Sequence, residues 1–111
     1  MSTLSTHVLD AASGLPATGI RVTLKRRHGD GWQPLGEAVP DDDGRVRDLA
    51  PGGLGAGVHE LVFATGEWFA ATGQTGFYPE VPVVFEVTDT SRHHHVPLLL
   101  SPYAYSTYRG S

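Results

Sequence analysis

The run His93-His94-His95 is the densest group of residues in the sequence that could perform chemistry. Alternate side chains of a β-strand face opposite ways, so an extended run places His93 and His95 on one face and His94 on the other. Two histidines so arranged could bind a metal ion or a substrate, although a solvated surface cluster is the commoner outcome. A metal site needs a third ligand, and neither carboxylates nor cysteines cluster nearby. We therefore predict no metal site and no cofactor.

A fourth histidine, His7, lies in a short run of alternating polar and apolar residues near the start of the chain. The alternation predicts that His7 shares a strand face with Ser5. A histidine on a strand is more often structural than catalytic. Its unperturbed pKa of about 6.5 nevertheless allows it to act as an acid or a base near neutral pH.

Arg45 and Arg47 follow Gly44 at a spacing that places both on one face of an extended run. Aspartates surround them at positions 41, 42, 43 and 48. The group could be a surface ion-pair cluster of little energetic value. Alternatively, one arginine could hold a planar, anionic substrate through two parallel hydrogen bonds.

The segment Ser101–Ser111 is rich in tyrosine, serine and threonine. Chain ends usually fray and carry no function, but this one has the pattern of a strand that could hold Tyr108, Arg109 and Ser111 in place. A serine nucleophile would be expected within a Gly-x-Ser-x-Gly turn, which the sequence lacks. We therefore discount a covalent serine mechanism.

Composition excludes several classes of protein and of site chemistry. The chain has 111 residues with no cysteine, so disulfide scaffolds, Cys-ligated metals and thiol catalysis are excluded. A net charge of −4 argues against sequence-independent binding of nucleic acid. No apolar run reaches the roughly 20 residues of a membrane-spanning helix, and no secretory signal is evident. We predict a cytoplasmic protein with neither membrane nor nucleic-acid partners.

The elements that must position these residues are short strands. Fourteen glycines and eight prolines favour a turn-rich β fold. Thr65–Gly73 predicts one short helix, with Trp68 and Phe69 packed against a sheet. Pro97 suggests that its strand is an edge strand or carries a bulge. The whole chain, 1–111, is predicted to be a single domain, an all-β antiparallel sandwich of eight strands, with strands at 4–9, 20–25, 32–39, 45–47, 58–64, 83–87, 93–100 and 103–108.

Three stretches give the chain a family resemblance: Leu4–Asp10 followed by Gly14-Leu-Pro-Ala17, then Asp43-Gly44-Arg45, and His95–Ser111 with its terminal Tyr-Arg-Gly-Ser. Together they resemble the transthyretin-like 5-hydroxyisourate hydrolases over nearly the whole chain. The terminal motif is the mark that separates these hydrolases from transthyretin, the hormone carrier.

The resemblance implies two four-stranded sheets with one short helix, assembled as a homotetramer (a dimer of dimers) with active sites at the dimer–dimer interface. It implies hydrolysis of 5-hydroxyisourate to 2-oxo-4-hydroxy-4-carboxy-5-ureidoimidazoline, on the way from urate to allantoin. The implied catalytic set is His7, Arg45, His95 and Ser111, and the implied substrate contacts are His7, Arg45, Tyr108 and Arg109. Either histidine could be the general base.

Two other functions are compatible with such a sandwich. One is a transthyretin-type carrier of small hydrophobic ligands, without catalysis. The other is an adhesion or carbohydrate-binding module. The basic residues and the terminal motif argue against both, because a carrier has no need of such a polar set and such modules seldom concentrate basic and aromatic groups at a free C-terminus.

Overall fold

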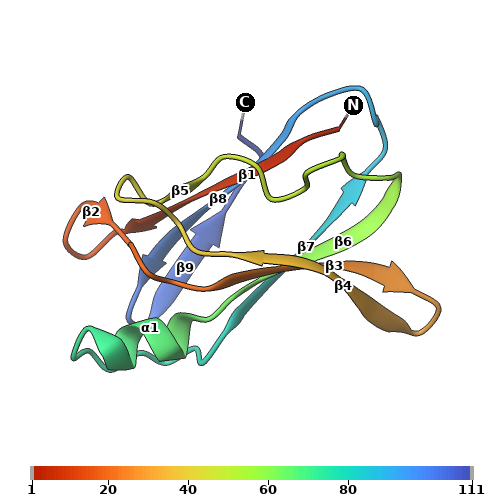
Figure 1. The fold of residues 1–111 in the computed structure, drawn as a ribbon. Coiled ribbons are helices and arrows are strands. Elements are labelled where there is room, and N and C mark those ends of the chain that lie inside the picture. The colour runs from red at the N-terminus through yellow and green to blue at the C-terminus, as the bar shows by residue number, and fades with distance from the viewer. Residues whose placement is uncertain (1, 111) are drawn as a thin grey trace.

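The computed structural model describes residues 2–110, which form two β-sheets packed face to face, with one short helix at one end (Figure 1). The first sheet has the order β2-β1-β8-β9, with β5 also paired to β1, and the second has the order β4-β3-β6-β7. The strands of the first sheet are β1 (Leu4–Asp10), β2 (Leu15–Pro16), β5 (Arg45–Val46), β8 (His94–Ser101) and β9 (Ala104–Thr107). Those of the second are β3 (Val22–His28), β4 (Gly31–Ala38), β6 (Gly57–Phe63) and β7 (Val81–Val87).

The core lies between the sheets because every second residue of the central strands is apolar and points inward. In β1, Leu4, Thr6 and Val8 are buried, whereas the residues between them are only half-buried. Thr6 is polar, but its hydroxyl donates a hydrogen bond to the carbonyl oxygen of Val96 at 2.6 Å, so its burial leaves no unpaired donor. The largest fully buried side chains include Phe63, Phe69, Leu4, Ile20, Leu24, Leu61, Leu98 and Leu100.

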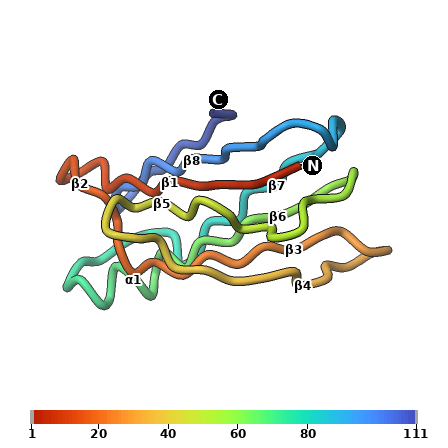
Figure 2. Tube along the Cα trace, turned by 45° about the horizontal axis from the view of Figure 1, so that its top comes forward, coloured from red at the N-terminus to blue at the C-terminus, as the bar shows by residue number. Residues whose placement is uncertain are grey.

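The sandwich confirms the predicted fold class, with two differences in detail. Residues 2–110 form nine strands, in sheets of five and four, because Leu15–Pro16 pairs briefly with β1. In addition, β1 and β8 run parallel, whereas the pattern predicted antiparallel strands throughout. Parallel neighbours need a long connection, and here the connection contains the whole second sheet. Figure 2 shows the resulting layers, with β1 beside β8 above the strands of the second sheet.

The expectation of an edge strand or bulge at Pro97 is wrong. β8 lies between β1 and β9, and its register against both is regular. Pro97 is accommodated because it falls between the last residue pair with β9, Leu98–Thr107, and an isolated bridge from His95 to Gly110. Its missing N–H therefore interrupts the β8–β9 ladder only at this gap, with pairing on both sides of it.

The helix α1 (Thr65–Ala71) confirms the predicted helix, two residues shorter at its end. Trp68 and Phe69 are buried, and the indole N–H of Trp68 donates to the carbonyl oxygen of Thr18 at 2.8 Å. Thr65 does not cap the helix, because Ala64 occupies the N-cap position and the Thr65 hydroxyl donates to the carbonyl oxygen of Tyr78. None of the helices in residues 2–110 has the length and apolar character needed to cross a membrane.

Candidate active site on the outer face of the first sheet

Strand register gathers the predicted basic residues on one face. Arg45 of β5 lies directly opposite His7 of β1, and His95 of β8 lies opposite Ser5 of β1. Residues opposite each other project from the same side of a sheet. Because Thr6, between Ser5 and His7, is buried against the second sheet, this shared side is the outer face of the first sheet. Residues 7, 45 and 95, far apart in sequence, thus form one polar group.

A cavity of about 190 Å³ opens on this face. It is lined by Ser5, Thr6, Arg45, Val46, Arg47, His93 and His95. The lining combines guanidinium, imidazole and hydroxyl groups, which can bind an oxygen-rich anion and exchange protons with it. His7 is not among these lining residues, but it lies opposite Arg45 in the strand register.

Arg45 is held by the turn that precedes it. One Asp41 carboxylate oxygen accepts hydrogen bonds from the backbone N–H of Asp43 at 2.9 Å and of Arg45 at 3.0 Å. The bond from Arg45 is the main reason why the pKa of Asp41 is lowered. Gly44 has φ 75°, and a Cβ there would meet the carbonyl oxygen of Val8 at 2.5 Å. Only glycine therefore lets the chain turn this close to β1.

His7 contacts the same turn. Its Nε2 lies 3.0 Å from the carbonyl oxygen of Asp43. A carbonyl only accepts, so Nε2 carries the proton in this hydrogen bond and Nδ1 is the basic nitrogen of the neutral ring.

His95 is half-buried, and its Nδ1 lies 2.7 Å from the Ser5 hydroxyl. Burial is the largest cause that lowers its pKa, followed by the positive charges of Arg45, His93 and His7. The neutral form, which can accept a proton, is therefore favoured near neutral pH. This is the protonation state that a general base requires.

The C-terminal segment closes against His95. The backbone N–H of Gly110 donates to the carbonyl oxygen of His95 at 2.8 Å. A Cβ at Gly110 would lie 2.3 Å from Cδ2 of the His95 ring, a distance that no side chain could occupy. A glycine is therefore required here by close approach to the imidazole.

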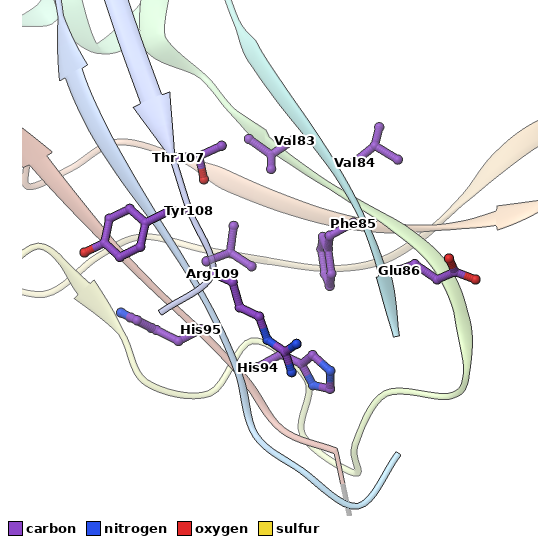
Figure 3. A pocket seen from close by; sticks show the side chains of 10 residues that line it. Val83, Val84, Phe85, Glu86, His94, His95, Thr107, Tyr108 and Arg109 are labelled. Carbon is purple, nitrogen blue, oxygen red and sulfur yellow. The ribbon is translucent and has the colours of Figure 1, made fainter. Parts of the chain in front are cut away.

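Tyr108 lies on the outer face. It falls in register with Pro97, which is two residues from His95 along β8 and so shares its face. Figure 3 shows its ring beside the His95 side chain. Tyr108 is exposed, as a residue that contacts a substrate should be.

Arg109 points the other way. It falls in register with Val96, which is buried between the sheets. Its side chain extends towards His94 and Phe85 (Figure 3), and together they line a second cavity of about 230 Å³. Burial and then the charge of Arg109 lower the pKa of His94. Arg109 is thus directed away from His7 and Arg45, but it shares the lining of this second cavity with His95 and Tyr108. Ser111 lies outside the described residues.

The histidine run confirms the predicted alternation, since His94 is buried and bonded to Ser2 while His93 is exposed. The catalytic set implied by the sequence contained neither His93 nor Ser5, yet the two are hydrogen-bonded at 2.8 Å. Their proximity depends on the register of β1 against β8, which no local pattern reveals. Within residues 2–110, no group of three or more His, Cys, Asp or Glu side chains is arranged to hold a metal ion.

Two sheets in this order, with two histidines and an arginine on one outer face, define a transthyretin-like sandwich that carries a polar site. The sequence model of the HIUase/Transthyretin family matches residues 4–110. The chain belongs to this family.

Three relatives show how close the similarity is. The 5-hydroxyisourate hydrolase of Caulobacter vibrioides is 48% identical over 115 residues, covering 100% of both chains. The solved structure of Klebsiella pneumoniae 5-hydroxyisourate hydrolase has a TM-score of 0.89 and 38% identity, covering 98% of this chain and 99% of that one. Sea bream transthyretin in complex with thyroxine has a TM-score of 0.91 and 31% identity, covering 97% and 94%. The backbone alone therefore does not separate a hydrolase from a carrier.

Proposed function

We propose that this protein hydrolyses 5-hydroxyisourate to 2-oxo-4-hydroxy-4-carboxy-5-ureidoimidazoline, in the degradation of urate to allantoin. The observation that carries the proposal is the convergence of His7, Arg45 and His95 on one outer face, in a chain whose curated relatives are named 5-hydroxyisourate hydrolase.

The reaction opens the six-membered ring. A water oxygen attacks a ring carbonyl carbon, the bond from that carbon to the neighbouring ring nitrogen breaks, and a carboxylate forms. The attacking water gives up both of its protons: one passes to the departing nitrogen, and the other is released when the new carboxyl group ionises. The site must therefore supply a proton acceptor, a proton donor and stabilisation of negative charge on the attacked carbonyl oxygen.

The described residues provide these functions. The Ser5 bond engages Nδ1 of His95, and the Asp43 carbonyl engages Nε2 of His7, so each ring has one nitrogen held by the protein and another available for proton exchange. Either histidine can be the base. Arg45 binds the planar substrate and stabilises developing negative charge, and Tyr108 contacts the ring. We assign Ser111 the orientation of the water, through its hydroxyl or terminal carboxylate.

The rival function is a carrier of small hydrophobic ligands, favoured by the match to thyroxine-bound sea bream transthyretin. The polar lining of the 190 Å³ cavity argues against it, because an apolar ligand would leave the guanidinium and imidazole groups without hydrogen-bond partners.

The decisive experiment generates 5-hydroxyisourate with urate oxidase and follows its absorbance. Added protein should accelerate the decay well above the spontaneous rate. Unchanged decay together with tight binding of thyroxine would favour the carrier instead. A metal chelator should leave the rate unchanged, and a loss restored by zinc would show that the histidines bind metal.

We further propose a homotetramer, a dimer of dimers. Both β7 and β9 end their sheets in the described chain, and edge strands pair readily with another copy. Apolar side chains are exposed on or beside them, including Val84 and Tyr105. Light scattering checks the assembly, and a fully active monomer would contradict it. We also propose that residues 1–111 form one domain, since both sheets share one core, and that the protein is cytoplasmic.

A further inference from the structure

A row of hydrogen bonds links two hydroxyl groups and two imidazoles across β1 and β8. The Thr3 hydroxyl is bonded to Nδ1 of His93. The Ser5 hydroxyl then joins Nε2 of His93, at 2.8 Å, to Nδ1 of His95, at 2.7 Å. Ser5 is thus the only link in this row between His93 and the histidine of the proposed site.

We propose that Ser5 is a positioning residue for His95. Its hydroxyl fixes the orientation of the His95 ring and determines which ring nitrogen carries the proton. The proposal deepens the proposed hydrolase function and rests on it for its effect on rate, but its effect on the His95 tautomer is independent of any reaction.

A hydroxyl group has a single proton, so Ser5 can donate to only one of its two neighbours. In one arrangement, His95 donates from Nδ1 to Ser5, Ser5 donates to Nε2 of His93, and Nε2 of His95 is left as a base. In the other arrangement, Ser5 donates to His95, and Nε2 of His95 carries the proton. The first arrangement is the one that a general base needs, and it requires Nε2 of His93 to accept.

His93 therefore influences His95 without approaching the substrate. In the first arrangement the proton of neutral His93 is on Nδ1, where the Thr3 hydroxyl can accept it. When Nε2 of His93 is protonated instead, Ser5 accepts that proton and its own proton turns to His95. The protonation of the His93 ring therefore determines, through the Ser5 hydroxyl, which nitrogen of His95 carries a proton.

The fold does not depend on this hydroxyl. β1 pairs with β8 along its full length, Leu4–Asp10, and its inward side chains form part of the core. Ser5 points outward and is half-buried. Its replacement by alanine removes no core contact and leaves the backbone ladder intact, so the variant should fold.

The test compares Ser5→Ala with Ser5→Thr, which restores a hydroxyl on a residue that strands favour. We expect Ser5→Ala to lower kcat about tenfold or more with little change in KM, since only part of a general base's 10²–10⁴-fold contribution is lost. Ser5→Thr should recover most of the loss. Ser13→Ala, which removes a hydroxyl bonded to Asp10 in the turn after β1, is the matched control and should be silent.

Long-range ¹H–¹⁵N NMR reads the tautomer directly. Wild-type His95 should show its proton on Nδ1, and Ser5→Ala should convert it to a mixture of tautomers. His93→Ala should also lower kcat, less than His95→Ala does, and should add little once Ser5 is already alanine, because both changes break the same row.

An unchanged kcat and an unchanged His95 tautomer in Ser5→Ala would overturn the proposal, and so would a loss of kcat that Ser5→Thr fails to restore. If the wild-type protein shows no hydrolysis at all, the proposed function fails, while the tautomer measurement still tests the role of Ser5.

Discussion

The outer faces of the two sheets both carry charged side chains around a cavity, but they differ in whether the arginine beside the cavity is paired with carboxylates. Beside β3, Arg21 lies 3.0 Å from Glu67 and 3.6 Å from Glu37, so its charge is neutralised by neighbours. On the first sheet, Arg45 and the histidines at positions 7 and 95 form no ion pair with any residue in the range 2–110. The charge of Arg21 is compensated by its neighbours, whereas Arg45 leaves positive charge for a ligand.

Size would point to the wrong face. The cavity beside Arg21 measures about 380 Å³, twice the 190 Å³ of the cavity beside Arg45. Paired surface charges contribute little and gain nothing by binding an anion, whereas imidazoles held by hydrogen bonds beside an unpaired guanidinium can do acid–base work. Uncompensated charge, and not volume, therefore distinguishes the candidate site.

The strongest test of this difference replaces one residue on each face. His95→Ala should lower the hydrolysis rate by about 10²–10⁴-fold, the usual contribution of a general acid or base. His7→Ala and Arg45→Ala should be similarly severe. Arg21→Ala should leave the rate unchanged, with circular dichroism confirming that all variants are folded. Equal losses on both faces would remove the distinction between them.

Gly110→Ala should have the next largest effect. The new Cβ would collide with the His95 ring, so either the ring or the tail must move. We expect the rate to fall about tenfold or more with little loss of thermal stability, because misplacing a catalytic group by about 1 Å can cost 10²-fold. Gly31→Ala is the control, since nothing lies within 4 Å of a Cβ there. A fully active Gly110→Ala variant would show that the tail does not constrain His95.

A smaller loss is expected when the turn before Arg45 is loosened. Asp41→Ala removes the acceptor for two backbone N–H groups. Because Arg45 is then no longer held in one position, kcat/KM should fall several-fold. Asp89 accepts similar bonds from Ser91 in the turn between β7 and β8, outside the turn that holds Arg45. Steady-state kinetics should therefore separate Asp41→Ala from a silent Asp89→Ala.

The smallest effect concerns protonation. Because the folded pKa of His95 is lowered, unfolded chains bind more protons below pH about 6.5. This contribution to stability is present above that pH and is lost as the pH falls from there towards the folded pKa. Arg45→Gln removes a positive neighbour, so an NMR titration should show the His95 pKa rising towards its ordinary value. Arg21→Gln should not move it, and an equal rise there would contradict the assignment of Arg45 as its neighbour.

Much of this arrangement was accessible from sequence because it depends on local patterns. Alternation located the strands and separated His94 from its neighbours, and the family motifs selected His7, Arg45 and His95. What sequence could not supply is pairing over distance. The contact of Ser5 with His95 depends on a register between strands some 90 positions apart. The direction of the Arg109 side chain, towards His94 rather than towards Arg45, depends on where the tail rejoins β8, which no local pattern reveals.

The parallel pairing of β1 and β8 has a consequence for folding. The Ser5–His95 contact spans 90 positions, so loop-closure entropy must be overcome before it forms, and topologies dominated by such distant contacts fold slowly. The two halves of the site therefore meet only when the intervening sheet has collapsed. Enzymatic activity during refolding should return with the slowest structural phase, which makes catalysis a reporter of complete folding.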